Sequence, residues 1–557
     1  MKLIEFSLIG LLLFFSFIVN YYYGHQGLMP LDDLQNFNSG FRVKLGDFPF
    51  IDYFSITGPI LDIWQSNIYK VFGVNWQSFV IHASIMNCLY SLSIFIFLKK
   101  LDFTILQSFI FSLSGGLLMY PPTGNPTVEH NSLTLSIIAL FCFIIGLKEK
   151  KNYFLIISIF IFCLSFFTKQ VPTIYFVAFC ILIYFTKIFS EIKISKTIFL
   201  ILFSIFIFSI FIFYFLINGV SLINILNQYF IFATSLGESR FDNINFVIFY
   251  ENTSKLFFLI FLIIPSIYFS IITRNFSNIF MVFGLSLIII IYENHSQNQT
   301  ITFSLLPVIL ALFYFFYNEE KLNNNLVKYF FYIIIIYAFY RILRYEILYI
   351  LIFFILIFIF IFMNWKKRII SLNHLILIYL CIVSCFYFEK YVKIRSWDDL
   401  NKNSLSNSFD AYIIDKKLSN LKWRTVYFDD IKKEKKLIQN TLKFLKKLEN
   451  SKYILISDYQ IYNIILNKKD YSPVKYWFKD HTYPSIDHKL RSDFDTFFKK
   501  KIYDNEVSLI ILDNTAEFKT KELKNFSWLF KCLTEINHSN KPKQIDAFLV
   551  DQQCLLN

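Results

Sequence analysis

Acidic side chains gather directly after the first apolar run of the chain. Asp32 and Asp33 follow that run by about nine residues. A carboxylate there can act as a general base, because its surroundings can tune its pKa. It can equally hold a hard divalent cation together with Glu129 or His130, since such cations favour oxygen ligands. In a third interpretation the Asp pair only caps a short helix that starts near Leu34, because Asp is a favoured N-cap residue.

Three further polar groups lie beside apolar runs. In PTGNPTVEHNS (122–132), Glu129 and His130 precede such a run, and capping of the following helix is the structural alternative. In FFTKQVP (166–172), Lys169 can bind a lipid phosphate or simply extend its ammonium to the membrane surface. In YENHSQNQT (292–300), Glu293 and His295 crowd a short turn, where hydrogen bonding alone would also explain the histidine.

The rest of the chain indicates a membrane protein. It has 557 residues, a mean hydropathy of +0.50 and 71 Phe. Apolar runs of about 18 or more residues are typical of membrane spans, and helices satisfy their own backbone hydrogen bonds in lipid. We therefore expect a polytopic α-helical protein with about thirteen spans, at 4–23, 77–98, 103–120, 132–147, 153–168, 171–186, 197–217, 255–273, 277–292, 301–317, 327–345, 346–363 and 369–388.

The distribution of Lys and Arg predicts the orientation of these spans. With thirteen spans, the basic loops all fall on one side, which the positive-inside rule makes cytoplasmic together with Met1. The opposite face then receives loops 24–76, 121–131, 169–170, 218–254 and 293–300, and the tail. The net charge of +14 is explained by these topology-setting loops and a solvated tail, without any nucleic-acid surface. A multi-pass protein of a bacterial plasma membrane is expected.

The chain divides into a membrane domain, 1–388, and a soluble C-terminal domain, 389–557. Short apolar runs of strand character around a Lys-rich helical stretch at 430–449 predict a small α/β domain. The strands are expected at 425–428, 453–457, 508–512 and 547–550. The domain has no nucleotide-binding fingerprint. Cys532 and Cys554 can form a disulfide if this domain faces an oxidising compartment.

The polar residues converge on one predicted face of the membrane. Ionisable residues at the edges of spans are costly, so their presence suggests a function. The outer loops hold Asp32, Asp33, Glu129 and Lys169, and we expect a polar cavity that opens outward at the membrane surface. The other members of this set are Asp47, Asp52, His130, Gln170, Arg240, Glu251, Glu293, Asn294, His295 and Asn298.

The first outer loop carries a recognisable pattern. An acidic pair is followed by Gly46-Asp47-Phe48-Pro49-Phe50, Asp52-Tyr53-Phe54, Gly58-Pro59 and Phe72-Gly73. This pattern, with Lys169-Gln170 later in the chain, resembles the membrane glycosyltransferases of the C-fold (GT-C) superfamily. The likeness is to bacterial protein O-mannosyltransferases, aminoarabinose transferases and lipopolysaccharide-core transferases that use polyprenyl-phosphate sugars. It covers roughly residues 20–180. In that family the pair is commonly Asp-Glu, whereas this chain has Asp-Asp.

The resemblance implies a mechanism and a set of substrates. Asp32 or Asp33, with Glu129, would serve catalysis by deprotonating an acceptor hydroxyl, which attacks the anomeric carbon with inversion. Lys169 would hold the donor phosphate, with Arg240 or the arginines Arg341 and Arg344. Substrate contacts are expected from Asp52, His130, Gln170, Glu293 and His295. The implied partners are a polyprenyl-phosphate sugar, an extracytoplasmic lipid, glycan or protein acceptor, and membrane lipids. A divalent cation is left open as a cofactor.

Three other functions compete with this interpretation. A lipid-linked sugar flippase or polysaccharide polymerase would handle similar lipids without this chemistry. A transporter would place ionisable residues in the middle of spans, whereas here they cluster at one surface. A non-catalytic membrane scaffold, whose tail binds a partner, is the third.

Overall fold

We describe the protein from a computed structural model. The residues described are 2–119, 124–188, 194–235, 372–389, 408–425, 430–448, 450–514, 520–536 and 541–556.

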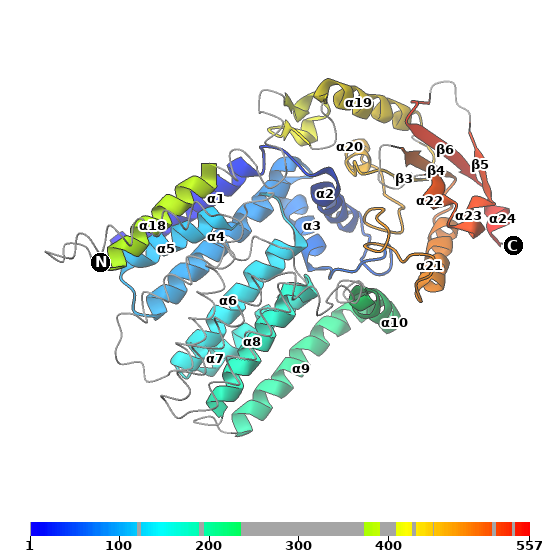
Figure 1. Cartoon of the computed structure of the whole chain (residues 1–557). Helices are drawn as coiled ribbons and strands as arrows, with labels where there is room; N and C mark the ends of the chain where they lie inside the picture. Colours follow the sequence, from blue (N-terminus) through cyan, green and yellow to red (C-terminus); the bar gives the residue numbers. More distant parts are fainter. Residues whose placement is uncertain are drawn as a thin grey trace, which may run out of the picture.

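Long apolar helices form one half of the molecule (Figure 1). Within the described residues, four helices are long and apolar enough to cross a membrane. They are α1 (Lys2–Tyr23), α4 (Trp76–Lys100), α6 (Val128–Lys148) and α9 (Ile194–Ile217). Helices also occupy other predicted spans: α5 (Ile105–Leu118), α7 (Asn152–Phe166), α8 (Gln170–Ile188) and α18 (Leu372–Tyr387). The five spans predicted between 255 and 363 lie outside the described residues.

The helices divide into inner and outer members. In the most apolar 18-residue stretch of each helix, 61% of the residues are buried in α4 and 72% in α6. The buried share is 17% in α1 and 11% in α9. Helix α1 packs on α4 and α5, α6 packs on α7 and α8, and α18 covers α5. The exposed apolar surface of α1 and α9 is the surface expected of helices that face lipid.

The first predicted outer loop folds into two helices at one end of this bundle (Figure 1). They are α2 (Pro30–Lys44) and α3 (Ile60–Phe72), and they pack against each other. The helix that we expected to start near Leu34 begins at Pro30, which occupies the first helical position, where a missing N–H costs nothing. Asp32 and Asp33 therefore lie inside its first turn and are not its N-cap residues. Helix α3 was not predicted from the sequence.

The C-terminal part contains a four-stranded mixed sheet in the order β3-β4-β6-β5. Strand β3 (Tyr453–Ile456) runs parallel to β4 (Leu509–Asp513), whereas β6 (Ile545–Val550) is antiparallel to both β4 and β5 (Leu533–Glu535). These strands confirm the strand predictions at 453–457, 508–512 and 547–550, and α19 (Ile431–Lys447) confirms the helical stretch. The strand predicted at 425–428 differs from the nearest strand of the structure. That strand, β2 (Lys422–Trp423), ends before residue 425 and pairs with β1 (Phe409–Asp410). Residues 426–429 lie outside the described residues.

Helices cover both faces of the sheet. Tyr453 and Leu455 of β3 face a core shared with α19, whereas Ile454 and Ile456 face a core shared with α21 (Arg491–Asp504), as the alternation of strand side chains requires. A disulfide joins Cys532 to Cys554, the pair left open by the sequence. The remaining short elements are α10 (Leu222–Asn224), η1 (Ile225–Phe232), η6 (Ala411–Ile413), η7 (Lys416–Leu418), α20 (Tyr462–Leu466), α22 (Thr520–Leu523), α23 (Ser527–Phe530) and α24 (Gln552–Leu556).

The C-terminal part packs directly on the end of the helix bundle that carries α2. Leu34, Phe37 and Phe41 of α2 share one buried core with Trp423 of the C-terminal part and with Trp76 at the start of α4. The two parts of the chain therefore form a continuous apolar interface, and α2 lies between them (Figure 1).

Candidate active site

Three residues singled out from the sequence lie near one another at this end of the bundle. Asp32 is in the first turn of α2, Glu129 in the first turn of α6, and Lys169 in the turn between α7 and α8. The Lys169 ammonium forms an ion pair with Glu129. The carboxylate of Asp32 is close enough to both for their charges to change its pKa. Two carboxylates and one ammonium, separated by up to 137 positions in the sequence, thus share one site.

The two neighbouring aspartates have different surroundings. Asp32 is exposed, yet protein atoms surround it, as expected for a group on the wall of an open recess. This partial desolvation raises the pKa of Asp32; the charge of Glu129 raises it further, and Lys169 opposes the rise. Asp33 is fully buried, and its Oδ2 accepts a hydrogen bond of 2.8 Å from the Met29 N–H. Asp32 is therefore the aspartate that a substrate can reach, whereas Asp33 ties down the start of α2.

Buried hydroxyl groups hold the backbone at Lys169. Ser132 Oγ and Thr173 Oγ1 each donate to the Lys169 carbonyl at 3.0 Å. Ser165 donates to the Ser132 carbonyl at 2.7 Å and lies 2.6 Å from Thr173 Oγ1. All three hydroxyl residues have no exposed surface. The three helices α6, α7 and α8 are thereby joined beneath Lys169, which fixes the backbone from which its side chain extends to Glu129.

The motif glycine Gly58 lies against the same turn. Its N–H donates to the Thr168 carbonyl at 3.1 Å, and a Cβ atom at Gly58 would come within 1.7 Å of the Phe167 oxygen. No side chain can therefore be placed there unless the backbone moves. Gly58 is required because the first loop runs directly over the residues before Lys169.

Three of the predicted substrate-binding residues have structural partners. Asp52 accepts from the Phe48 N–H at 2.7 Å and pairs with Lys501 at 2.8 Å, contacts that lower its pKa against the opposing effect of burial. His130 is buried, with Nδ1 lying 2.6 Å from Thr127 Oγ1. Gln170 donates to the backbone oxygens of Ile56 and Tyr229, at 3.3 and 2.6 Å. These contacts show how the three residues support the loops around the site.

The remaining predicted residues lie outside the described part of the chain. They are the phosphate-binding candidates Arg240, Arg341 and Arg344 and the substrate-binding candidates Glu293 and His295. Within the described residues, no group of three His, Cys, Asp or Glu side chains is arranged to hold a metal ion. Glu129 is paired with Lys169, and we derive no step through a metal.

Several buried charged residues near the site were not selected from the sequence. Arg42 and Asp62 are each 1% exposed, and Lys475 is 6% exposed. Asp62 binds Lys475 at 2.6 Å and accepts from the Tyr53 hydroxyl at 2.7 Å. Tyr53 belongs to the loop motif, and its place there was the one sequence signal that could have pointed to Asp62. Lys475 is more than 400 positions away from its partner and carries no such signal.

Comparison with known proteins finds similar chains among solved structures. No protein-family model matches the chain, and no curated protein matches it by sequence. Among solved structures, the chain is similar to ArnT from Cupriavidus metallidurans bound to undecaprenyl phosphate, at 8% identity over 97% of each chain with a TM-score of 0.48. ArnT in the apo state gives 10% identity, a TM-score of 0.47 and coverage of 96% of this chain and 97% of that chain.

A third similar structure is an oligosaccharyltransferase from Archaeoglobus fulgidus tethered with an acceptor peptide. It shows 12% identity and a TM-score of 0.36, over 99% of this chain and 74% of that chain. Likeness at these levels carries no argument about activity. The functional conclusion therefore rests on the loop motif and on the geometry of Asp32, Glu129 and Lys169.

Proposed function

We propose that this protein is a membrane glycosyltransferase that moves a sugar from a polyprenyl-phosphate donor to an acceptor hydroxyl with inversion. The observation that carries the proposal is the convergence of Asp32, Glu129 and Lys169 at one end of the helix bundle. The loop motif that resembles GT-C transferases lies over the same place, because Gly58 packs on the turn that holds Lys169.

In this proposal Asp32 is the general base. It takes the proton of the acceptor hydroxyl, whose oxygen then forms a bond to the anomeric carbon. The bond from that carbon to the phosphate oxygen breaks, and the polyprenyl phosphate leaves with the electron pair. A raised pKa makes Asp32 a stronger base than an ordinary aspartate.

Lys169 supplies positive charge for the leaving phosphate. Because Lys169 is paired with Glu129, the donor phosphate has to compete with that carboxylate or share the ammonium with it. Two carboxylates and one ammonium leave these three residues net negative, and in this proposal a second cation also binds the donor phosphate. Arg240, Arg341 and Arg344 remain the sequence-predicted candidates for it.

The positions of charges favour a transferase over a transporter. In the four long apolar helices, the charged side chains are Lys2, Glu5, Lys99, Lys100, Glu129, Lys148 and Lys196, all near the helix ends. A transport pathway through these helices would be expected to place ionisable groups in mid-span. We place the site and the C-terminal part on the extracytoplasmic side of a bacterial plasma membrane.

The test is a transfer assay with purified protein in lipid. Radiolabelled polyprenyl-phosphate sugars are offered with a membrane extract as the acceptor pool, with and without a chelator. We expect transfer by the natural protein and a loss of about 1,000-fold in Asp32→Asn, since general-base catalysis contributes on the order of 100- to 10,000-fold. No transfer from any donor by folded protein would overturn the proposal, and loss of transfer with chelator would show that a metal takes part.

A further inference from the structure

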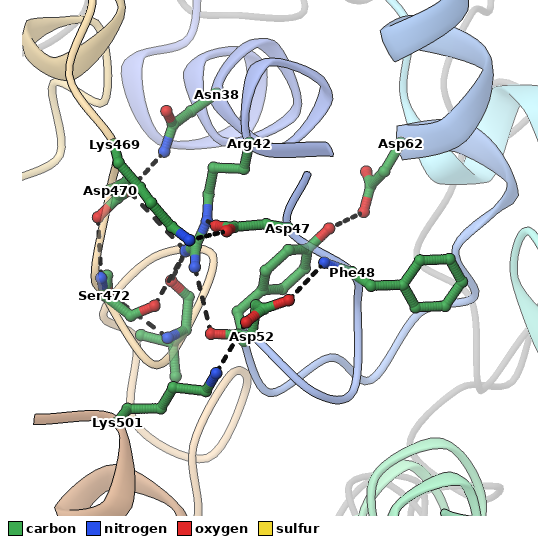
Figure 2. A network of polar contacts seen from close by, with 12 residues as sticks. Asn38, Arg42, Asp47, Phe48, Asp52, Asp62, Lys469, Asp470, Ser472 and Lys501 are labelled. Atoms are coloured by element: carbon green, nitrogen blue, oxygen red, sulfur yellow. Dashed lines mark hydrogen bonds and ion pairs between the residues drawn. The ribbon is translucent and has the colours of Figure 1, made fainter. Parts of the chain in front are cut away.

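A short segment of the C-terminal part, residues 469–475, contacts both the first loop and α2 (Figure 2). Its backbone is bonded to that loop, because the Phe54 N–H donates to the Pro473 oxygen at 2.7 Å. The segment begins and ends with lysines. Lys469 pairs with Asp47 at 2.9 Å, and Lys475 pairs with Asp62 at 2.6 Å.

The first set of contacts reaches α2 through Asp470. Asn38 donates to Asp470 Oδ2 at 2.7 Å, and Arg42 lies 3.9 Å from the same oxygen. Arg42 also donates to the Ser472 carbonyl at 2.9 Å and pairs with Asp47 at 3.0 Å. Asn38, Arg42, Asp47 and Asp470 are each at most 2% exposed. Asn38 and Arg42 belong to the helix whose first turn carries Asp32.

The turn at Gly46 makes this arrangement possible. Gly46 has a φ of +98°, which glycine adopts without strain, and it lets the chain turn back so that the Asp47 N–H donates to the Arg42 carbonyl at 3.0 Å. The Asp47 carboxylate then lies between Arg42 and Lys469, as Figure 2 shows.

The second set of contacts reaches the turn of Lys169. Lys475 pairs with Asp62 of α3 and donates to Thr57 Oγ1 at 3.4 Å. Next to Thr57, the Gly58 N–H binds the Thr168 carbonyl, and the Ile56 carbonyl accepts from Gln170. A chain of direct contacts therefore runs from Lys475 through residues 56–58 to the residues on both sides of Lys169.

The charges in this interface balance. Arg42, Lys469, Lys475 and Lys501 supply four positive charges, and Asp47, Asp52, Asp62 and Asp470 supply four negative ones. Each cation is within ion-pair distance of at least one of these carboxylates, so the network needs no external ion. This separates it from the Asp32, Glu129 and Lys169 group, which has an excess of negative charge.

We infer that residues 469–475 position both catalytic groups of the active site. Asp470 holds α2, and so Asp32, through Asn38 and Arg42, while Lys475 holds the turn of Lys169 through Asp62 and Thr57. The inference rests on the proposed function. Asp470 and Lys475 touch no reacting atom and are positioning residues, and they give the C-terminal part a role in catalysis.

The two sets of contacts predict different kinetic effects. Asp470→Asn keeps the side-chain shape but removes the charge that faces Arg42, so Asp32 is displaced and kcat falls with donor KM nearly unchanged. Lys475→Met displaces the Lys169 turn and raises donor KM. A loss of roughly 100-fold in kcat/KM is expected for each, which is the effect of displacing a catalytic group by about 1 Å. Arg42→Lys, which keeps the charge but loses the forked contacts, should resemble Asp470→Asn.

A measurement independent of activity accompanies the kinetics. Amide hydrogen exchange should become faster at the start of α2 in Asp470→Asn and around residues 165–170 in Lys475→Met. The control is Lys452→Met, which breaks an exposed ion pair of 2.8 Å to Glu506 in the same C-terminal part and should change neither readout.

The outcomes separate the inference from the proposed function. If the natural protein transfers no sugar, the proposed function fails, while hydrogen exchange still shows whether the segment holds α2 and the turn. If the natural protein is active, full activity in both variants overturns the inference. The inference is also overturned if both variants change kcat and KM in the same way and lose activity only to the extent that less of the protein is folded.

Discussion

At the scale of single residues, the central contrast is between Asp32 and Asp33. Both were candidates for the same role, because neighbouring aspartates cannot be distinguished by residue type. In the structure Asp32 is exposed beside two other charged groups, whereas Asp33 is fully buried against the Met29 N–H. The difference follows from the helix, which turns successive residues by about 100° and so directs them to different surroundings.

The charges around Asp32 predict the pH dependence of transfer. A base acts only when it is deprotonated, so activity is lost as the pH falls through the pKa of Asp32. In Glu129→Gln a neighbouring negative charge disappears and Lys169 loses its partner, and both changes lower the pKa of Asp32. The acid limb of the kcat/KM profile should therefore move to lower pH.

Lys169→Met should have the opposite effect on the same profile. Removing the ammonium takes away the charge that lowers the pKa of Asp32, so the acid limb should move to higher pH. The rate should also fall by about 100-fold, because one stabilising group at the leaving oxygen is lost. Asp102→Asn, which changes an exposed carboxylate paired with Lys148 at the far end of α4 and α6, is the control. Shifts in the same direction for both variants would contradict this account of the site.

At the scale of elements, the loop over residues 45–59 connects α2, α3 and the Lys169 turn. Its motif residues act through backbone geometry and buried contacts: Gly46 forms a turn, Tyr53 binds Asp62, and Gly58 allows close approach to Phe167. The sequence motif therefore marks a loop that supports the candidate site. The acidic residue within it that we expected to bind substrate, Asp52, is paired with Lys501 of α21.

Gly58→Ala tests this close approach. The added methyl group would overlap the Phe167 oxygen, so the loop and the turn must separate, and transfer should fall by about 100-fold. Gly10→Ala in α1 is a matched control, because its Cβ would meet no atom within 4 Å. The transfer assay, with unfolding temperatures for both variants, provides the measurement. Unchanged transfer in Gly58→Ala would show that the loop does not support the site.

At the scale of the whole molecule, the two ends of the helix bundle differ in charge and in what covers them. Lys99, Lys100, Lys148 and Lys151 lie at one end, where Glu149 and Asp102 accept ion pairs. The C-terminal part, with its Cys532–Cys554 disulfide, covers the other end. Both features support an outward-facing C-terminal part, because lysines favour the cytoplasmic side and disulfides persist in oxidising compartments.

The disulfide gives a test of this orientation. After mild reduction of intact cells, a membrane-impermeant thiol reagent should label Cys532 and Cys554, and without reduction it should label neither. The pair Cys532→Ser with Cys554→Ser should also lose about 3 kcal/mol of stability in the C-terminal part, the amount expected for a loop of roughly 20 residues. Labelling that requires permeabilised cells would contradict the proposed orientation.

The sequence by itself determined what depends on local pattern. Runs of apolar residues predicted the long helices of the described bundle, and short apolar runs of strand character predicted three strands of the C-terminal sheet. The positions of Asp32, Glu129 and Lys169 beside the long runs selected the site residues. These features can be predicted locally, because the spacing of apolar residues in a helix or a strand is visible within the residues of that element. The helix α3 was missed, since its polar and apolar residues lie in a segment too mixed to read as a span.

Only the tertiary structure decided which of these residues meet and what holds them. Asp32 was separated from Asp33 by burial, which depends on packing between α2 and its neighbours. Asp470 and Lys475 were brought to α2 and α3 across more than 400 positions of sequence. Ordinary lysines and aspartates acquire such roles only through their partners, because the attraction between charges depends on distance and burial, and neither is encoded in local sequence.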